Sequence, residues 1–141
     1  MIYAKAFVSI LLAMAARKAS ALGARQSNPD CLDNLGEEAL GNGDDAKACN
    51  TQLQARGSQA CNANSLQTVL CQQGNTTLSV LNVQLNTLGG SDAGNTAESC
   101  EGVAEAVGRI FDTCFRGDNT VRGQVLAADN SNVLVDVRAV P

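Results

Sequence analysis

The sequence contains no histidine and no tryptophan, and aromatic residues of any kind are few. Histidine is the usual general base and proton carrier, so its absence excludes Ser-His-Asp and Cys-His catalysis and histidine-based nuclease mechanisms. Tyr3 and Phe7 lie in the N-terminal leader described below, which leaves only Phe111 and Phe115. Platforms that stack on sugars or bases are usually built from aromatic rings. We therefore expect a non-catalytic protein with an aliphatic core.

The N-terminal leader indicates a secreted protein. Residues 1–21 combine a basic start at Lys5, an apolar run over 6–16 and a small-residue exit at 19–21. This order predicts a secretory signal peptide, because the apolar run is too short for a membrane span of about 20 residues. We expect the protein to be secreted into the extracellular space.

The leader can be cleaved at either of two positions. Cleavage is expected after Ala15 or Ala21, and a second trimming can follow Arg25. Residues 26–141 then form one domain with six Lys and Arg against fourteen Asp and Glu, a net charge of −8. Such a domain lacks the basic face that nucleic acid or an anionic membrane requires, so we expect neither partner and no stable membrane insertion.

The chain contains six cysteines, enough for three disulfides. The six cysteines are Cys31, Cys49, Cys61, Cys71, Cys100 and Cys114. An even number in a secreted chain predicts three disulfides, each typically worth about 2 to 4 kcal/mol. No C-x-x-C pair occurs and no histidine could assist, so we expect no metal site and no cofactor.

The first half of the domain predicts two helices. Pro29 suits the first turn of a short helix that the glycine-rich tract ends by Gly41. A second helix is predicted over Asp44 to Arg56, because two aspartates complement the dipole at its start and Gly57 offers a stop.

A hairpin follows in the middle of the chain. Residues 65–72 and 76–85 both alternate between apolar and polar, with a Gln-Gly-Asn turn between them. In the second strand the apolar phase slips between Val80 and Leu81, and a β-bulge there would restore one inward face.

The longest predicted helix runs from Thr96 to Phe115. Asn95 and Glu98 form a capping-box pair at its start, and Gly117 closes its end. Its apolar stripe is Cys100, Val103, Ala104, Val107, Ile110, Phe111 and Cys114, and its outer face is Glu101, Glu105, Arg109 and Asp112.

Two further strands are predicted after this helix, over 122–127 and 133–139, joined by a turn at 129–132. The valines of the last strand point inward, and Asp136 and Arg138 point outward. These elements predict an α+β fold, a two-layer sandwich in which helices cover one side of a four-stranded antiparallel sheet.

The long helix limits how the disulfides can pair. Cys100 and Cys114 lie fourteen positions and so about 21 Å apart along one helix, whereas bonded cysteines need Cα atoms within about 7 Å. Each must reach a different partner, and Cys61 to Cys71 is a plausible local bridge.

Two short motifs and several carboxylate pairs remain. Arg116-Gly117-Asp118 is an integrin-type adhesion signature, but Gly117 as a helix stop and Arg116 at the negative end of the dipole explain the tripeptide more simply. Asn75 begins a glycosylation sequon at the expected hairpin tip. Catalysis by two carboxylates needs one of them in a desolvated cleft, whereas we expect the three acidic pairs of this chain on a solvated surface: Glu37 with Glu38, Asp44 with Asp45, and Glu101 with Glu105.

The run SCEGVAEAVGRIFDTCFRGDNTVRGQVLAADNSNVLVDV, residues 99–137, resembles the small secreted cysteine-rich effectors of fungi and the related killer-toxin-like, necrosis-inducing proteins. This run and the proteins of that group share an amphipathic helix that begins and ends with cysteine, a glycine-containing strand start and a final valine-rich strand. The resemblance implies a disulfide-bonded α/β sandwich that binds an extracellular protein or surface component of a host or competitor. It carries no catalytic residues.

Three functions therefore compete. The leading expectation is a monomeric, non-catalytic effector. An extracellular hydrolase inhibitor, presenting a loop at 89–95, and a carrier of a small apolar ligand in the aliphatic core are the alternatives.

Overall fold

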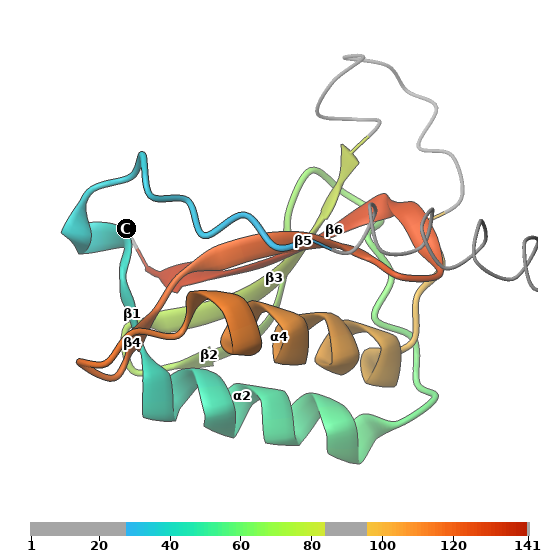
Figure 1. The fold of residues 1–141 in the computed structure, drawn as a ribbon. Helices are drawn as coiled ribbons and strands as arrows, with labels where there is room; N and C mark the ends of the chain where they lie inside the picture. The colour runs from blue at the N-terminus through green and yellow to red at the C-terminus, as the bar shows by residue number, and fades with distance from the viewer. Residues whose placement is uncertain (1–27, 84–95, 141) are drawn as a thin grey trace, which may run out of the picture.

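The computed structural model describes residues 28–83 and 96–140 as a four-stranded antiparallel sheet with two helices against one face (Figure 1). The elements are η1 (Glu37–Ala39), β1 (Gly41–Asn42), α2 (Gly43–Arg56), β2 (Thr68–Gln73), β3 (Thr76–Asn82), α4 (Cys100–Cys114), β4 (Thr120–Val121), β5 (Gly123–Ala127) and β6 (Asn130–Ala139). The α+β class and its helix-covered antiparallel sheet are confirmed. The predicted leader lies outside the described residues.

The main sheet has the strand order β2-β3-β6-β5, and each neighbouring pair is antiparallel. β3 and β6 pair from Thr76 opposite Ala139 to Asn82 opposite Val133. The last strand of the chain therefore lies in the interior of the sheet. β1 and β4 form a second sheet of two strands.

The core lies between the sheet and the two helices. Val133, Val135 and Val137 of β6 are fully buried, as the alternation of this strand predicts. The buried residues of α4 are Cys100, Val103, Ala104, Ala106, Val107, Ile110 and Cys114. The predicted stripe is thus confirmed except at Phe111, which is half-buried and packs edge-on against Phe115 with ring centroids 5.8 Å apart.

The second predicted helix is confirmed as α2. The side chain of Asn42 caps it by accepting from the N–H groups of Asp44 and Asp45 at 2.9 and 3.1 Å. Gly57 follows the last helical residue with a φ of 57°, so it ends the helix as the sequence predicts.

The predicted start of the long helix is wrong, and its end lies one residue earlier than predicted. The helix starts at Cys100, where Ser99 Oγ accepts from the Gly102 N–H at 3.0 Å, and Asn95 lies outside the described residues. A serine directly before the helix supplies the cap that the capping-box pair was expected to give. At the other end Phe115 is already extended, and Gly117 is not among the described glycines of positive φ, so it is no helix stop.

The predicted helix that begins at Pro29 is absent, and only the short turn η1 forms before β1. Asp30 instead exchanges two backbone hydrogen bonds with Gln124 of β5, at 2.8 and 2.9 Å. The buried side chain of Arg122 donates to the carbonyls of Cys31 and Gly36. Tertiary hydrogen bonds therefore hold this segment against the sheet and outweigh its local helical signals.

The predicted bulge in β3 is also wrong. Val80 and Leu81 pair in regular register with Val135 and Leu134 of β6. The slip in apolar phase leaves Val80 fully buried and Leu81 half-exposed on the opposite side of the sheet.

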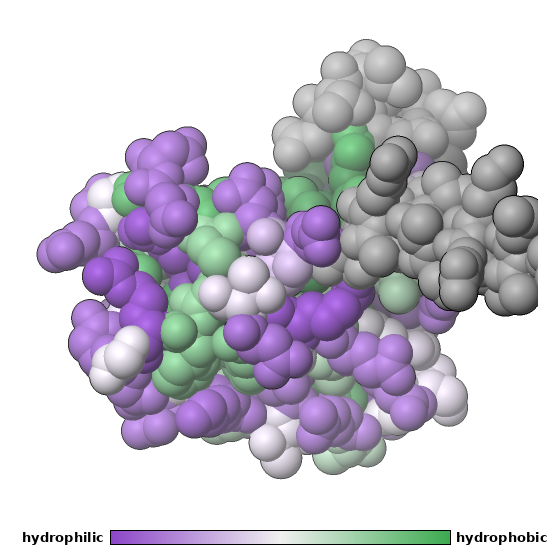
Figure 2. All heavy atoms as spheres, viewed as in Figure 1, coloured by the Kyte–Doolittle hydropathy of each residue, from purple (hydrophilic) through white to green (hydrophobic). Residues whose placement is uncertain are grey.

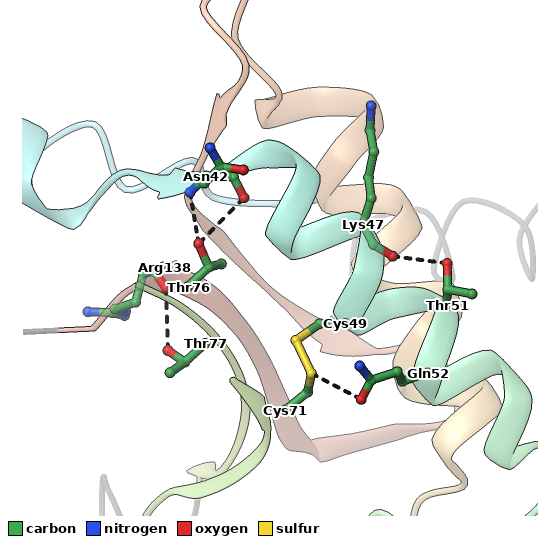
Figure 3. The surroundings of a disulfide bond; sticks show 9 residues. All are labelled: Asn42, Lys47, Cys49, Thr51, Gln52, Cys71, Thr76, Thr77 and Arg138. Carbon is green, nitrogen blue, oxygen red and sulfur yellow. Dashed lines mark hydrogen bonds between the residues drawn. A yellow bond between two sulfur atoms is a disulfide. The ribbon is translucent and has the colours of Figure 1, made fainter. Parts of the chain in front are cut away.

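A register shift occurs instead in β2. Val69 pairs with Ser79, but Cys71 pairs with Leu78, so one extra residue is inserted between them. The insertion brings Cys71 to the same side of the sheet as Leu78, where it bonds to Cys49 of α2 (Figure 3). The bulge therefore serves the disulfide.

Three disulfides join the six cysteines as Cys31–Cys114, Cys49–Cys71 and Cys61–Cys100. The expectation that the two cysteines of the long helix reach different partners is confirmed, and the expected Cys61 to Cys71 bridge is wrong. Cys61 forms a backbone hydrogen bond with Glu98 beside the start of α4, which brings it to Cys100 and not to the hairpin.

Candidate functional site

The side of the sheet that α2 and α4 do not cover carries a shallow groove. Its volume is about 360 Å³. It is lined by Gln67, Val69, Gln72, Thr77, Leu81, Asp136, Arg138, Ala139 and Val140. The strand order places β2, β3 and β6 side by side, so residues far apart in sequence meet on one surface.

The floor of this groove is polar. Asp136 lines the groove, and Ser79 lies opposite Asp136 across β3 and β6; both are 1% exposed. Gln67 reaches over from the segment before β2, and its Nε2 donates to Ser79 Oγ at 3.2 Å. Because the buried polar atoms here have partners inside the protein, the floor is ordered before any ligand arrives.

A charge pair fixes one end of the groove. Arg138 Nε donates to Asp136 Oδ1 at 2.7 Å, and its NH2 group pairs with Oδ2 of the same carboxylate. The hydrogen bond to Asp136 raises the pKa of Arg138 above its ordinary value, although partial burial acts in the other direction. Asp136 and Arg138 lie on the face of β6 opposite its buried valines, as predicted, but Asp136 is only 1% exposed, and Arg138, two residues on along β6, lies against it.

The rim of the groove is apolar on the β2 side. Val69 is 52% exposed, and Leu81 is half-exposed. Arg138 keeps a third of its side chain exposed, so its guanidinium remains accessible beside these aliphatic groups. Because the charges of Asp136 and Arg138 neutralise each other and Val69 is aliphatic, the groove suits a peptide or protein surface better than a strongly charged ligand.

Hydrophilic residues cover most of the view of the molecule in Figure 2, with hydrophobic side chains in smaller patches between them. Leu66 and Val69 are the exposed large hydrophobic residues of the described chain. Both belong to the segment that leads into or forms β2, so this edge of the sheet carries the most exposed large apolar side chains of the described residues.

The acidic pairs weighed for catalysis do not form a cleft. Glu37 and Glu38 are exposed in η1, and Glu101 and Glu105 are exposed on α4. Asp44 and Asp45 lie in the first turn of α2, where their charge complements the helix dipole. Within residues 28–83 and 96–140, no group of three potential ligand side chains is placed to hold a metal ion.

Sequence reasoning missed a second hollow, which joins the start of α4 to the β5–β6 turn. Its lining includes Asn62, Glu98 and Asp129. Burial raises the pKa of Glu98, the charges of Asp129 and Glu105 raise it further, and the hydrogen bond from the Ser99 N–H opposes them. Asp129 is distant from Glu98 in sequence, and the bond that Asn130 Nδ2 donates to the Ala97 carbonyl at 2.9 Å holds the β5–β6 turn beside the start of α4.

The two sequence motifs lie on the surface. Asn75 is exposed in the two-residue turn between β2 and β3, where Gly74 has a φ of 53°. Glycosylation of Asn75 stays a prediction. Arg116, Gly117 and Asp118 are all exposed between α4 and β4.

The fold and surface define a small, three-disulfide α+β domain with a groove on the side of its sheet that the helices leave uncovered. The chain belongs to the family described as a domain of unknown function (DUF8794), whose model matches residues 26–139. Neither curated proteins nor solved structures give a match. None of the described helices is both long and apolar enough to cross a membrane.

Proposed function

We propose that this protein is a secreted, non-catalytic effector that binds a protein of a host or competitor organism through the groove beside β2. The groove is the observation that carries the proposal. It combines an exposed aliphatic side chain at Val69 with the charge pair of Asp136 and Arg138. An exposed aliphatic side chain can supply the apolar contact that the centre of a protein interface needs, and the buried polar groups beside it already have partners inside the protein.

Secretion is supported by the predicted leader and by three disulfides, which persist in oxidising compartments. The family match starts at residue 26 and so leaves the predicted leader out. The resemblance of residues 99–137 to fungal effectors and killer-toxin-like proteins supports the direction of action, outside the producing cell.

The two alternatives have less support. The loop at 89–95, on which the hydrolase-inhibitor hypothesis depends, lies outside the described residues. An apolar-ligand carrier needs an enclosed aliphatic cavity, whereas the groove is open and its lining includes the charged pair of Asp136 and Arg138.

The test uses the purified, oxidised protein, infiltrated into leaf tissue and added to growing fungal cultures. We expect necrosis, an immune response or growth inhibition, and inertness in both assays would overturn the effector proposal. Val69→Glu should remove the response, because it places a charge on the rim of the groove. Leu66→Glu is the matched control, because Leu66 is similarly exposed, at 56%, and does not line the groove. Equal loss in both variants would argue against the groove.

A further inference from the structure

The tripeptide Arg116-Gly117-Asp118 lies in a tight hairpin loop. The Arg116 N–H donates to the Thr120 carbonyl at 2.9 Å, and the Asn119 N–H donates to the Arg116 carbonyl at 3.1 Å. Residues 117–119 are therefore a three-residue loop closed by Arg116 and Thr120. Asn119 has a φ of 62°, the left-handed residue that ends such loops.

The conformation of this loop does not require glycine at position 117. Among the described glycines, Gly57 and Gly74 have positive φ, and Gly117 does not. A Cβ built on Gly117 meets nothing within 4 Å. Since α4 ends before it without using it as a cap, neither backbone conformation nor packing accounts for glycine here. The glycine helix stop, one part of the simpler explanation of the tripeptide, is thereby removed.

The loop presents its two charges outward. Arg116, Gly117 and Asp118 are all exposed. Thr120 Oγ1 donates to Asp118 Oδ1 at 2.5 Å. This bond holds the pKa of Asp118 below its usual range, and the charge of Arg116 acts in the same direction. The loop thus carries an ionised carboxylate and a guanidinium on either side of a residue without a side chain.

The base of the loop is fixed to the body of the protein at several points. The Cys31–Cys114 disulfide lies two residues before Arg116. The Gly43 N–H at the start of α2 donates to the Asn119 carbonyl at 2.8 Å, and β4 pairs with β1 directly after the loop. A loop held in this way loses little conformational entropy when it binds.

We propose that the Arg116–Thr120 hairpin is an adhesion site for a cell-surface receptor of the integrin type, which reads a carboxylate and a guanidinium across a glycine. The carboxylate of Asp118 would complete the oxygen coordination of a divalent cation held by the receptor. The guanidinium of Arg116 would pair with a receptor carboxylate, where its planar fork gives two hydrogen bonds. This activity is independent of the groove proposed above.

The test measures binding of the full, oxidised protein to a purified integrin ectodomain that binds Arg-Gly-Asp peptides, in the presence of Mn²⁺. We expect saturable binding that EDTA abolishes and a cyclic Arg-Gly-Asp peptide displaces. Absence of binding, or binding that neither EDTA nor the peptide affects, would overturn the proposal.

Gly117→Ala separates recognition from structure. Because the added Cβ meets nothing and φ is not positive, the urea midpoint should be unchanged or slightly higher. Receptor binding should fall by about thirtyfold or more, as on loss of a central contact residue. Asp118→Glu, which keeps the charge and lengthens the side chain, should reduce binding as strongly.

Gly108→Ala is the matched control, since a Cβ on Gly108 of α4 also meets nothing within 4 Å. It should leave receptor binding unchanged. A drop in the urea midpoint of Gly117→Ala would show that the glycine is structural. Wild-type binding by Gly117→Ala and Asp118→Glu would show that another surface binds the receptor. Either result contradicts the proposal.

Discussion

Arg138 pairs with Asp136 through two donors, with Nε 2.7 Å from Oδ1, although the two residues lie only two positions apart on one face of β6. Asp136 is 1% exposed. Its carboxylate is therefore removed from water and depends on Arg138 for compensation.

We expect Arg138→Met to lower the free energy of unfolding by about 3 kcal/mol at neutral pH, because it leaves a buried carboxylate unpaired. The double variant Asp136→Val with Arg138→Met should recover most of this loss, since two apolar groups replace the pair. Urea unfolding of the two variants measures the difference. A small effect of the single variant would show that water reaches Asp136.

The three disulfides should differ in what they contribute. They close loops of 83, 39 and 22 residues for Cys31–Cys114, Cys61–Cys100 and Cys49–Cys71. Chain entropy predicts losses of about 4.5, 3.9 and 3.4 kcal/mol when each pair is replaced by serine. Urea unfolding of the three double-serine variants tests the order. The reverse order would show that native contacts, and not loop closure, set the contribution.

Asn50 of α2 is a site where a substitution should stabilise the protein. It is 8% exposed, and its Oδ1 has no hydrogen-bond partner. A buried acceptor without a partner typically costs about 1 to 3 kcal/mol, so Asn50→Leu should raise the free energy of unfolding by about 1 kcal/mol. Gln54→Leu, an exposed position in the same helix, is the control and should change little. Destabilisation by Asn50→Leu would mean that the site cannot hold the branched side chain.

Glu98 gives stability a dependence on pH. Its pKa is raised above 4.5 in the folded protein, chiefly by burial, so ionisation of Glu98 costs the folded state stability as the pH rises above 4.5. Glu98→Gln should therefore stabilise the protein at neutral pH, by about 0.5 kcal/mol because the side chain is partly solvated. The difference from the wild type should vanish well below pH 4.5.

Thermal unfolding of Glu98→Gln across this pH range checks the prediction. Glu37→Gln, at an exposed glutamate in η1, is the control. A stabilisation of Glu98→Gln that stays constant with pH would mean that charge is not its cause.

Local patterns predicted the elements that have strong local signals. α2 was predicted to within one residue at its start, because two aspartates and a following glycine mark its ends. The buried valines of β6 followed from strict alternation. The helix signal lies in the residues at its two ends, and the strand signal lies in an alternation of period two. Both can be read from neighbouring residues in the sequence.

Patterns failed where distant contacts compete with local preference. The segment after Pro29 has helical spacing, yet Asp30 pairs with Gln124 and the carbonyls of the segment accept from Arg122. The bulge was placed in the wrong strand because apolar phase alone does not report which strand must turn a cysteine toward α2. The groove likewise joins β2, β3 and β6, whose order the sequence does not give.

The sequence by itself determined the composition of this protein: an acidic, aliphatic, cysteine-bonded α+β domain in which Cys100 and Cys114 need separate partners. Those conclusions follow from counts and from distances along one helix, which are local quantities. Tertiary structure alone decided which partners they take, which side of the sheet stays uncovered, and that Gly117 is not a helix stop. The first two depend on long-range strand pairing, because a shift of one residue in register moves a side chain from one face of the sheet to the other. The third depends on the bonds that close the loop from Arg116 to Thr120.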